Sequence, residues 1–166
     1  MSITLDDITG MSGKRRDFLE FAIDCVGLPS TAFLGRNYPV GPSGDMSCSG
    51  FICWIADEKG IIRPMSKFTE RPVRTSREIF FYWGKPVSYE EADAGDLVFF
   101  SAGGVKVSHI GIYIGNDLYI ASPGTKGKRI VFAEVDEFEP HYFPEGRRGK
   151  FDIVFEQNPV GFNRIF

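Results

Sequence analysis

The stretch from Ser108 to Gly115 reads Ser-His-Ile-Gly-Ile-Tyr-Ile-Gly and decides how the second half of the chain folds. An isoleucine at every second position predicts a strand with an isoleucine face and an opposite face that carries His109, Gly111 and Tyr113. The Gly-Asn-Asp sequence at its end is a hairpin signal that leads into a second strand at Leu118–Ser122. Together these segments predict an antiparallel pair of strands.

Other apolar segments extend this pattern in both directions. Short segments bounded by glycine, proline or charge predict further strands at Gly95–Ser101, Arg129–Ala133, Phe151–Phe155 and Phe162–Phe166. Helical spacing of apolar residues predicts helices at Gly13–Gly27, Cys48–Gly60 and Ser76–Trp83. Helices followed by consecutive strands indicate an α+β fold with an antiparallel sheet. The segment Glu139–Gly149, rich in proline and glycine, predicts a surface loop.

The composition is that of a folded domain. Hydrophobic residues make up 43% and charged residues 25% of the 166 positions, which excludes a disordered or coiled-coil chain. A net charge of −3 argues against nucleic-acid binding, which needs a basic surface. No apolar run approaches the roughly 20 residues of a membrane helix, so we expect no integral membrane contact. We expect a single domain over residues 1–166 and leave its oligomeric state open.

The first residues, Met-Ser-Ile-Thr-Leu-Asp-Asp, lack the basic start and apolar run of a cleavable signal peptide. We therefore expect a protein that stays in the cytoplasm or leaves the cell by a non-classical route, as a phage or effector protein does.

Cys48 has the most informative surroundings of the three cysteines. It follows Ser47, a competent N-cap, so its sulfur is expected in the first turn of a helix. There the helix dipole and unpaired backbone N–H groups lower a thiol pKa toward neutrality, as a nucleophile requires. The alternative is a cysteine that serves as a small apolar residue, an interpretation that also fits Cys25 and Cys53.

No metal or cofactor is expected. Cys48 and Cys53 are five positions apart, outside the usual spacing of zinc-binding cysteines, and no pair of histidines has zinc-ligand spacing.

His109 is the natural partner of Cys48. It shares its strand face with Gly111, whose missing side chain would let the Cys48 helix approach closely. Two interpretations are open from the pattern alone: a general base for the thiol, and a histidine that makes a structural hydrogen bond.

Three motifs in this order resemble the NlpC family of cysteine hydrolases, the bacterial cell-wall peptidases of papain-like fold. They are Ser47-Cys-Ser-Gly-Phe, Gly95-Asp-Leu-Val-Phe-Phe and Ser108-His-Ile-Gly-Ile-Tyr-Ile-Gly. Arg74-Thr-Ser between the first two also fits that family, and the resemblance covers about 38–133. It implies a papain-like α+β fold in which N-terminal helices pack on a mainly antiparallel sheet and the nucleophile begins a helix.

The resemblance also implies roles for individual residues. Cys48 would be the nucleophile and His109, 61 positions later, the base. The thiolate attacks an amide carbonyl, the histidine protonates the departing amine, and water hydrolyses the thioester. The implied substrate site comprises Tyr38, Asp45, Ser47 and Ser49. Tyr38 also fits an aromatic residue packed on a surface loop.

Two positions depart from the family pattern. Ser47 stands where the family has an aspartate that holds a substrate amino terminus, and Asp45 is the nearest carboxylate. Ala121 stands where the family has a polar residue that orients the catalytic histidine, and alanine accepts no hydrogen bond from its side chain. A two-residue hairpin would place Ser122 on the face of His109 instead, either as an orienting residue or as an ordinary strand-end serine.

We therefore expect a cysteine hydrolase that cleaves an amide bond in peptidoglycan stem peptides or a related small peptide. Two alternatives remain open. One is a thiol acyltransferase or deacylase that acts on a lipid or protein, and the other is a catalytically decayed binding module on the same scaffold.

Overall fold

The computed structural model describes residues 13–28, 47–102, 106–116, 118–122, 131–134 and 161–166. The helices defined in these ranges are α2 (Gly13–Cys25), α3 (Cys48–Glu58) and α4 (Ser76–Tyr82). The strands are β1 (Lys85–Val87), β2 (Leu97–Ala102), β3 (Lys106–Gly115), β4 (Leu118–Ala121), β5 (Val131–Glu134) and β6 (Phe162–Arg164). The predicted strand Phe151–Phe155, the predicted loop Glu139–Gly149 and the candidate site residues Tyr38 and Asp45 lie outside the described residues.

The predicted helices are confirmed, and their starts follow from capping chemistry. Ser47 has an extended backbone, and its hydroxyl accepts the N–H of Gly50 at 3.0 Å, so α3 begins where the sequence predicted. Thr75 and Glu78 form a reciprocal capping box at the start of α4. In α3 and α4, a side chain next to the first turn satisfies backbone groups that the helix itself leaves unpaired.

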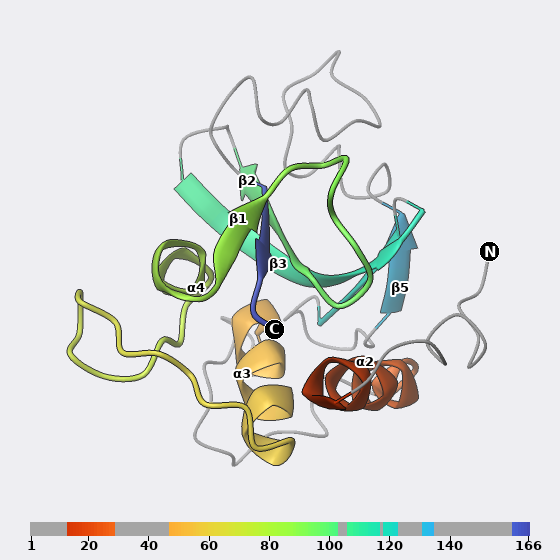
Figure 1. The fold of residues 1–166 in the computed structure, drawn as a ribbon, viewed down its shortest axis with the longest axis horizontal. Coiled ribbons are helices and arrows are strands. Elements are labelled where there is room, and N and C mark those ends of the chain that lie inside the picture. The colour runs from red at the N-terminus through yellow and green to blue at the C-terminus, as the bar shows by residue number, and fades with distance from the viewer. Residues whose placement is uncertain (1–12, 29–46, 103–105, 117, 123–130, 135–160) are drawn as a thin grey trace.

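The strands form one antiparallel sheet in the order β1-β6-β2-β3-β4-β5. The α+β prediction is therefore confirmed. The sequence analysis missed β1, which contains Pro86, a residue that weakens strand signals and is confined to sheet edges. Figure 1 shows α2 and α3 next to each other on one side of the curved sheet, with α4 at its flank. None of the helices in the described part of the chain has the length and apolar character needed to cross a membrane.

Asp96, from the Gly-Asp motif, joins distant parts of the chain. Its carboxylate is fully buried and accepts two hydrogen bonds of 2.9 Å from the Arg164 guanidinium of β6. Arg15 of α2 lies 3.8 Å from the same carboxylate and donates to the carbonyl of Ala94. This ion cluster fixes α2 and β6 against the start of β2, so the role of this motif residue is structural.

The β3–β4 hairpin has the pairing of a two-residue turn at its end, but the register shifts farther along the strands. Gly115 pairs with Leu118, but Tyr113 pairs with Tyr119, so the pairing shifts by one residue within the hairpin. Gly115 and Asn116 both have positive φ, 86° and 52°, which gives the turn its tight left-handed backbone. This shift decides which side chains share a face with His109.

Candidate active site

Cys48 is the first residue of α3, and its side chain is only partly buried. Burial is the largest influence on the pKa of its thiol and raises it above the ordinary value of 9.0. The backbone N–H groups of Ile110, Ser49 and Cys48 itself act in the opposite direction, because they favour a thiolate. The predicted net lowering of the thiol pKa is therefore wrong. The helix terminus does favour the anion, but desolvation outweighs it.

His109 lies on β3, directly opposite Phe100 of β2, and its side chain is only 2% exposed. Burial lowers the pKa of the imidazole from 6.5 to about 4, because removal from water disfavours the charged form. The ring is therefore neutral at pH 7 and retains a lone pair that can accept a proton.

The structure brings the nucleophile candidate next to the histidine strand. The Cys48 sulfur faces the backbone N–H of Ile110, the residue that follows His109, and α3 packs against β3. This contact joins two residues that are 62 positions apart in the sequence. A thiol at a helix start and an imidazole on the adjoining strand are the two groups that acyl transfer requires.

The side chains of the two serines beside Cys48 make contacts within the first turn of α3. The Ser47 hydroxyl accepts the N–H of Gly50 and lies 3.3 Å from the Ser49 hydroxyl. Ser49 is only 6% exposed. Their substrate roles stay predictions, and the structure adds a capping role for Ser47.

Ala121, rather than Ser122, shares the face of His109. Because Tyr119 pairs with Tyr113, the alternation of side chains places Ala121 on the same face as Tyr113 and His109. Ser122 is fully buried one residue beyond β4, where continued alternation turns it to the opposite face. The register argument for Ser122 as the orienting residue is therefore wrong, because the hairpin shift reverses the faces.

Sequence reasoning missed two aromatic residues that surround His109. The ring of Tyr119 lies 6.3 Å from the imidazole in an edge-on arrangement, and the ring of Phe100 lies 5.7 Å from it. The two aromatic rings also contact each other at 4.9 Å. Cross-strand pairing could have placed Phe100 here, but Tyr119 needed the hairpin register.

Gly111 makes room for Tyr119 rather than for α3. A Cβ atom added at Gly111 would lie 2.4 Å from the Tyr119 ring and 3.0 Å from the carbonyl oxygen of Ile120. The expectation that this glycine lets the Cys48 helix approach is therefore corrected. Its missing side chain lets the Tyr119 ring lie across the strand beside His109.

The remaining cysteines are buried thiols, as expected. Burial raises the pKa of Cys25 to about 11 and that of Cys53 to about 12. The Cys53 sulfur donates to the carbonyl of Val73 at 3.5 Å. Within the described ranges, no group of three His, Cys, Asp or Glu residues is arranged to hold a metal ion.

The fold and site together define a class, a papain-like α+β domain with a cysteine at a helix start and a histidine on the adjoining strand. The chain belongs to the NlpC/P60 family, whose sequence model matches residues 10–143. The resemblance inferred from the three motifs is thus confirmed.

Relatives and solved structures agree with this assignment. The probable endopeptidase p60 of Listeria seeligeri is 35% identical over 85 residues, which cover 50% of this chain and 14% of that protein. The bifunctional muramidase/DL-endopeptidase CwlT of Bacillus subtilis is 38% identical over 87 residues, 49% of this chain and 23% of that protein. The crystal structure of an NlpC/P60 family protein from Bacillus cereus superimposes with a TM-score of 0.58 at 25% identity, over 91% of this chain and 40% of that one. The matched regions thus make up less than a quarter of these two relatives.

Proposed function

We propose that this chain is a cysteine peptidase that cleaves an amide bond in peptidoglycan stem peptides. The observation that carries the proposal is the position of the Cys48 sulfur, at the start of α3 and facing the N–H of the residue after His109. Membership of the NlpC/P60 family and the endopeptidase names of the relatives support the substrate class.

The burial of both groups favours a neutral thiol and a neutral imidazole in the resting enzyme. The proton of Cys48 then passes to His109 as the sulfur forms its bond to the substrate carbonyl carbon. The carbonyl oxygen takes the negative charge, and the N–H groups at the start of α3 are available to stabilise it. The carbon–nitrogen bond breaks, and His109 returns the proton to the departing amine.

Water completes the cycle. It attacks the thioester carbonyl and gives one proton to His109, which passes it to the sulfur as the carbon–sulfur bond breaks. The products are the free thiol and a carboxylic acid, which releases the second proton of the water to solvent and becomes a carboxylate. A histidine with a pKa of about 4 remains a proton acceptor over the whole neutral range.

Tyr119 and Phe100 act in this proposal as positioning residues for His109. They contact the imidazole from β4 and β2 and limit the rotation of its ring. Because the polar orienting residue of the family is replaced by Ala121, aromatic packing takes over part of the orienting role.

Digestion of purified sacculi, followed by mass spectrometry of the released fragments, tests the function. The intact protein should release stem-peptide fragments, and Cys48→Ala should lower the rate by about 10³-fold or more. Cys25→Ala is the matched control, because it removes a buried thiol of α2 and should leave the rate within about 3-fold per folded molecule.

Two other outcomes would contradict this function. If no fragments are released while Cys48 still reacts with iodoacetamide, the acyltransferase or deacylase alternative replaces the peptidase. If no fragments are released and Cys48 is as unreactive as Cys53, the chain is a binding module.

A further inference from the structure

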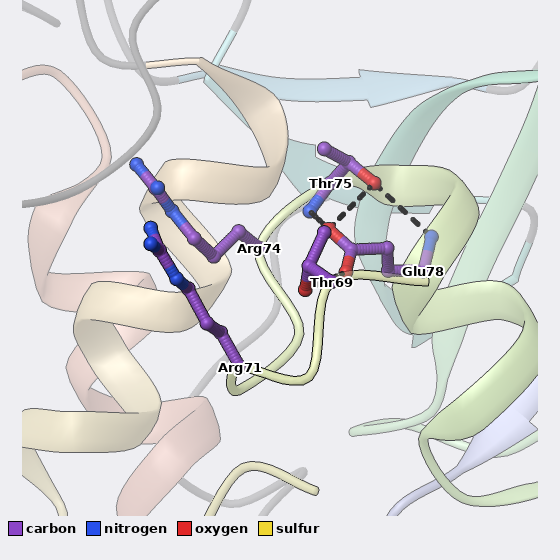
Figure 2. A pocket seen from close by; sticks show the side chains of 5 residues that line it. All are labelled: Thr69, Arg71, Arg74, Thr75 and Glu78. Carbon is purple, nitrogen blue, oxygen red and sulfur yellow. Dashed lines mark hydrogen bonds between the residues drawn. The ribbon is translucent and has the colours of Figure 1, made fainter. Parts of the chain in front are cut away.

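A cavity of about 360 Å³ lies between the segment that follows α3 and the start of α4. It is lined by Thr69, Arg71, Arg74, Thr75 and Glu78. Figure 2 shows the two arginine side chains extending in the same direction alongside a helix, while the two threonines and the glutamate gather at the other side. The cavity therefore has a cationic wall and a hydrogen-bonded wall.

Glu78 forms the hydrogen-bonded wall and has no capacity left for a ligand. Its carboxylate accepts the backbone N–H of Thr75 at 3.3 Å and the hydroxyls of Thr75 and Thr69 at 3.2 Å each. Burial by itself raises the pKa of this carboxyl, but hydrogen bonds from Ser66 and both threonines outweigh burial and lower it. Glu78 is therefore an ionised structural anchor that holds the threonines in place.

The two arginines, in contrast, have guanidinium groups that are unpaired among the described residues. Neither Arg71 nor Arg74 donates a side-chain hydrogen bond or forms an ion pair within the described residues, and both are exposed. Arg63, from the same segment, shows what a structural arginine does here, because it binds Asp57 at 3.0 Å and the carbonyl of Val73 at 2.6 Å. With the charge of Glu78 included, the cavity carries one net positive charge.

We propose that Arg71 and Arg74 form a subsite that binds a carboxylate of the stem peptide. Guanidinium groups bind carboxylates with two parallel hydrogen bonds, and two of them side by side suit one carboxylate with its four lone-pair positions. A single negative charge also balances the net charge of the cavity. This inference rests on the proposed peptidase function and names the part of the substrate that this site recognises.

The subsite lies beside the helix that carries the nucleophile. The sulfur of Cys53 faces the carbonyl of Arg74 at 3.9 Å, and Cys53 follows Cys48 by five residues on α3. Five helical residues span about 7.5 Å along the axis. An extended peptide covers that distance with two or three residues, so the backbone of Arg74 lies within reach of a stem peptide bound at Cys48.

Calorimetric titration of the Cys48→Ala protein tests the subsite without any turnover. The probes are synthetic stem-type tetrapeptides with free carboxylates and the same peptides with one carboxylate at a time converted to a carboxamide. We expect one such amidation to weaken binding by about 10-fold or more. The carboxylate whose amidation weakens binding is the one that the subsite binds. The series of peptides therefore distinguishes an internal carboxylate from the one at the peptide terminus.

Substitutions then assign this preference to the two arginines. Arg71→Gln combined with Arg74→Gln should weaken binding of the acidic peptide by about 10-fold and leave the amidated peptide within about 2-fold. Arg77→Gln is the matched control: Arg77 is also exposed but stacks over Phe68 at 5.1 Å, outside the cavity lining. The control should retain the full preference.

Equal affinity for acidic and amidated peptides would overturn the inference, as would a preference that survives the double substitution. An equal loss in Arg77→Gln would also overturn it, because general surface charge would then explain the binding. If the protein prefers the acidic peptide but releases nothing from sacculi, the result supports the subsite and contradicts only the proposed peptidase function.

Discussion

Two buried ionisable side chains of this protein, Asp96 and His109, have opposite surroundings. Around Asp96, a fully buried carboxylate is paired with two arginines from opposite ends of the chain. Around His109, a nearly buried imidazole packs against two aromatic rings, and burial holds its pKa at about 4.

Ion pairing and desolvation therefore act in different parts of this fold. A paired charge is costly to disturb and links α2, β2 and β6. In the proposed mechanism, a neutral His109 accepts the proton of the Cys48 thiol and needs no ion pair to hold it in place. The Asp96 cluster therefore has a structural role, whereas the surroundings of His109 suit the proposed chemistry.

The largest expected effect on stability comes from removing the charge of the Asp96 side chain. Asp96→Asn leaves two guanidinium groups without their shared carboxylate, so the free energy of unfolding should fall by about 3 kcal/mol or more. Urea denaturation measures it. Asp57→Asn, which breaks a more exposed pair with Arg63, should cost less than about 1 kcal/mol. Similar losses in both variants would show that the Asp96 cluster is not a special anchor.

The burial of His109 should make the free energy of unfolding depend on pH. The unfolded histidine titrates near 6.5 and His109 near 4, so the unfolded state binds more protons between these values. The free energy of unfolding should therefore decrease by about 3 kcal/mol as the pH falls from 6.5 to 4. His109→Gln should flatten this part of the curve in urea titrations, whatever its stability at pH 7. An unchanged slope would contradict the burial-shifted pKa.

The aromatic contacts of His109 can be separated from its general burial. Tyr119→Leu keeps an apolar core but removes the ring, so kcat should fall about 10-fold with little change in KM. The acid limb of the pH–rate profile should also move to higher pH as the imidazole becomes less confined. Tyr119→Phe keeps the ring and should retain activity within about 3-fold. An unchanged pH profile in the leucine variant would leave Tyr119 with a packing role only.

The smallest effect is expected at Ser122. The hairpin register turns Ala121 toward the face of His109 and Ser122 away from it, so Ser122→Ala should change kcat by less than about 3-fold. Steady-state kinetics on a stem peptide would measure this. A loss of 10-fold or more would mean that Ser122 orients the base despite the register.

Local patterns in the sequence were sufficient for most elements and for the family. Ser47 as an N-cap depends on neighbouring residues only, and so does the alternation from Ser108 to Gly115. Both predictions are confirmed. Motif order also predicted that Cys48 and His109 act together, and this pairing stays a proposal. The hairpin register could not be predicted, because it depends on an irregularity in the pairing between Tyr113 and Gly115 that the alternating sequence does not signal.

Residue patterns alone predicted the helix that starts at Cys48, the strand that carries His109 and the family of the chain. These features depend on residue spacing and on hydrogen bonds within a few positions. Three features became known only from the packed fold: Tyr119 fills the space at Gly111, β6 lies between β1 and β2, and burial outweighs the helix terminus at the thiol. Desolvation and long-range packing depend on which distant segments meet, and no local pattern encodes that.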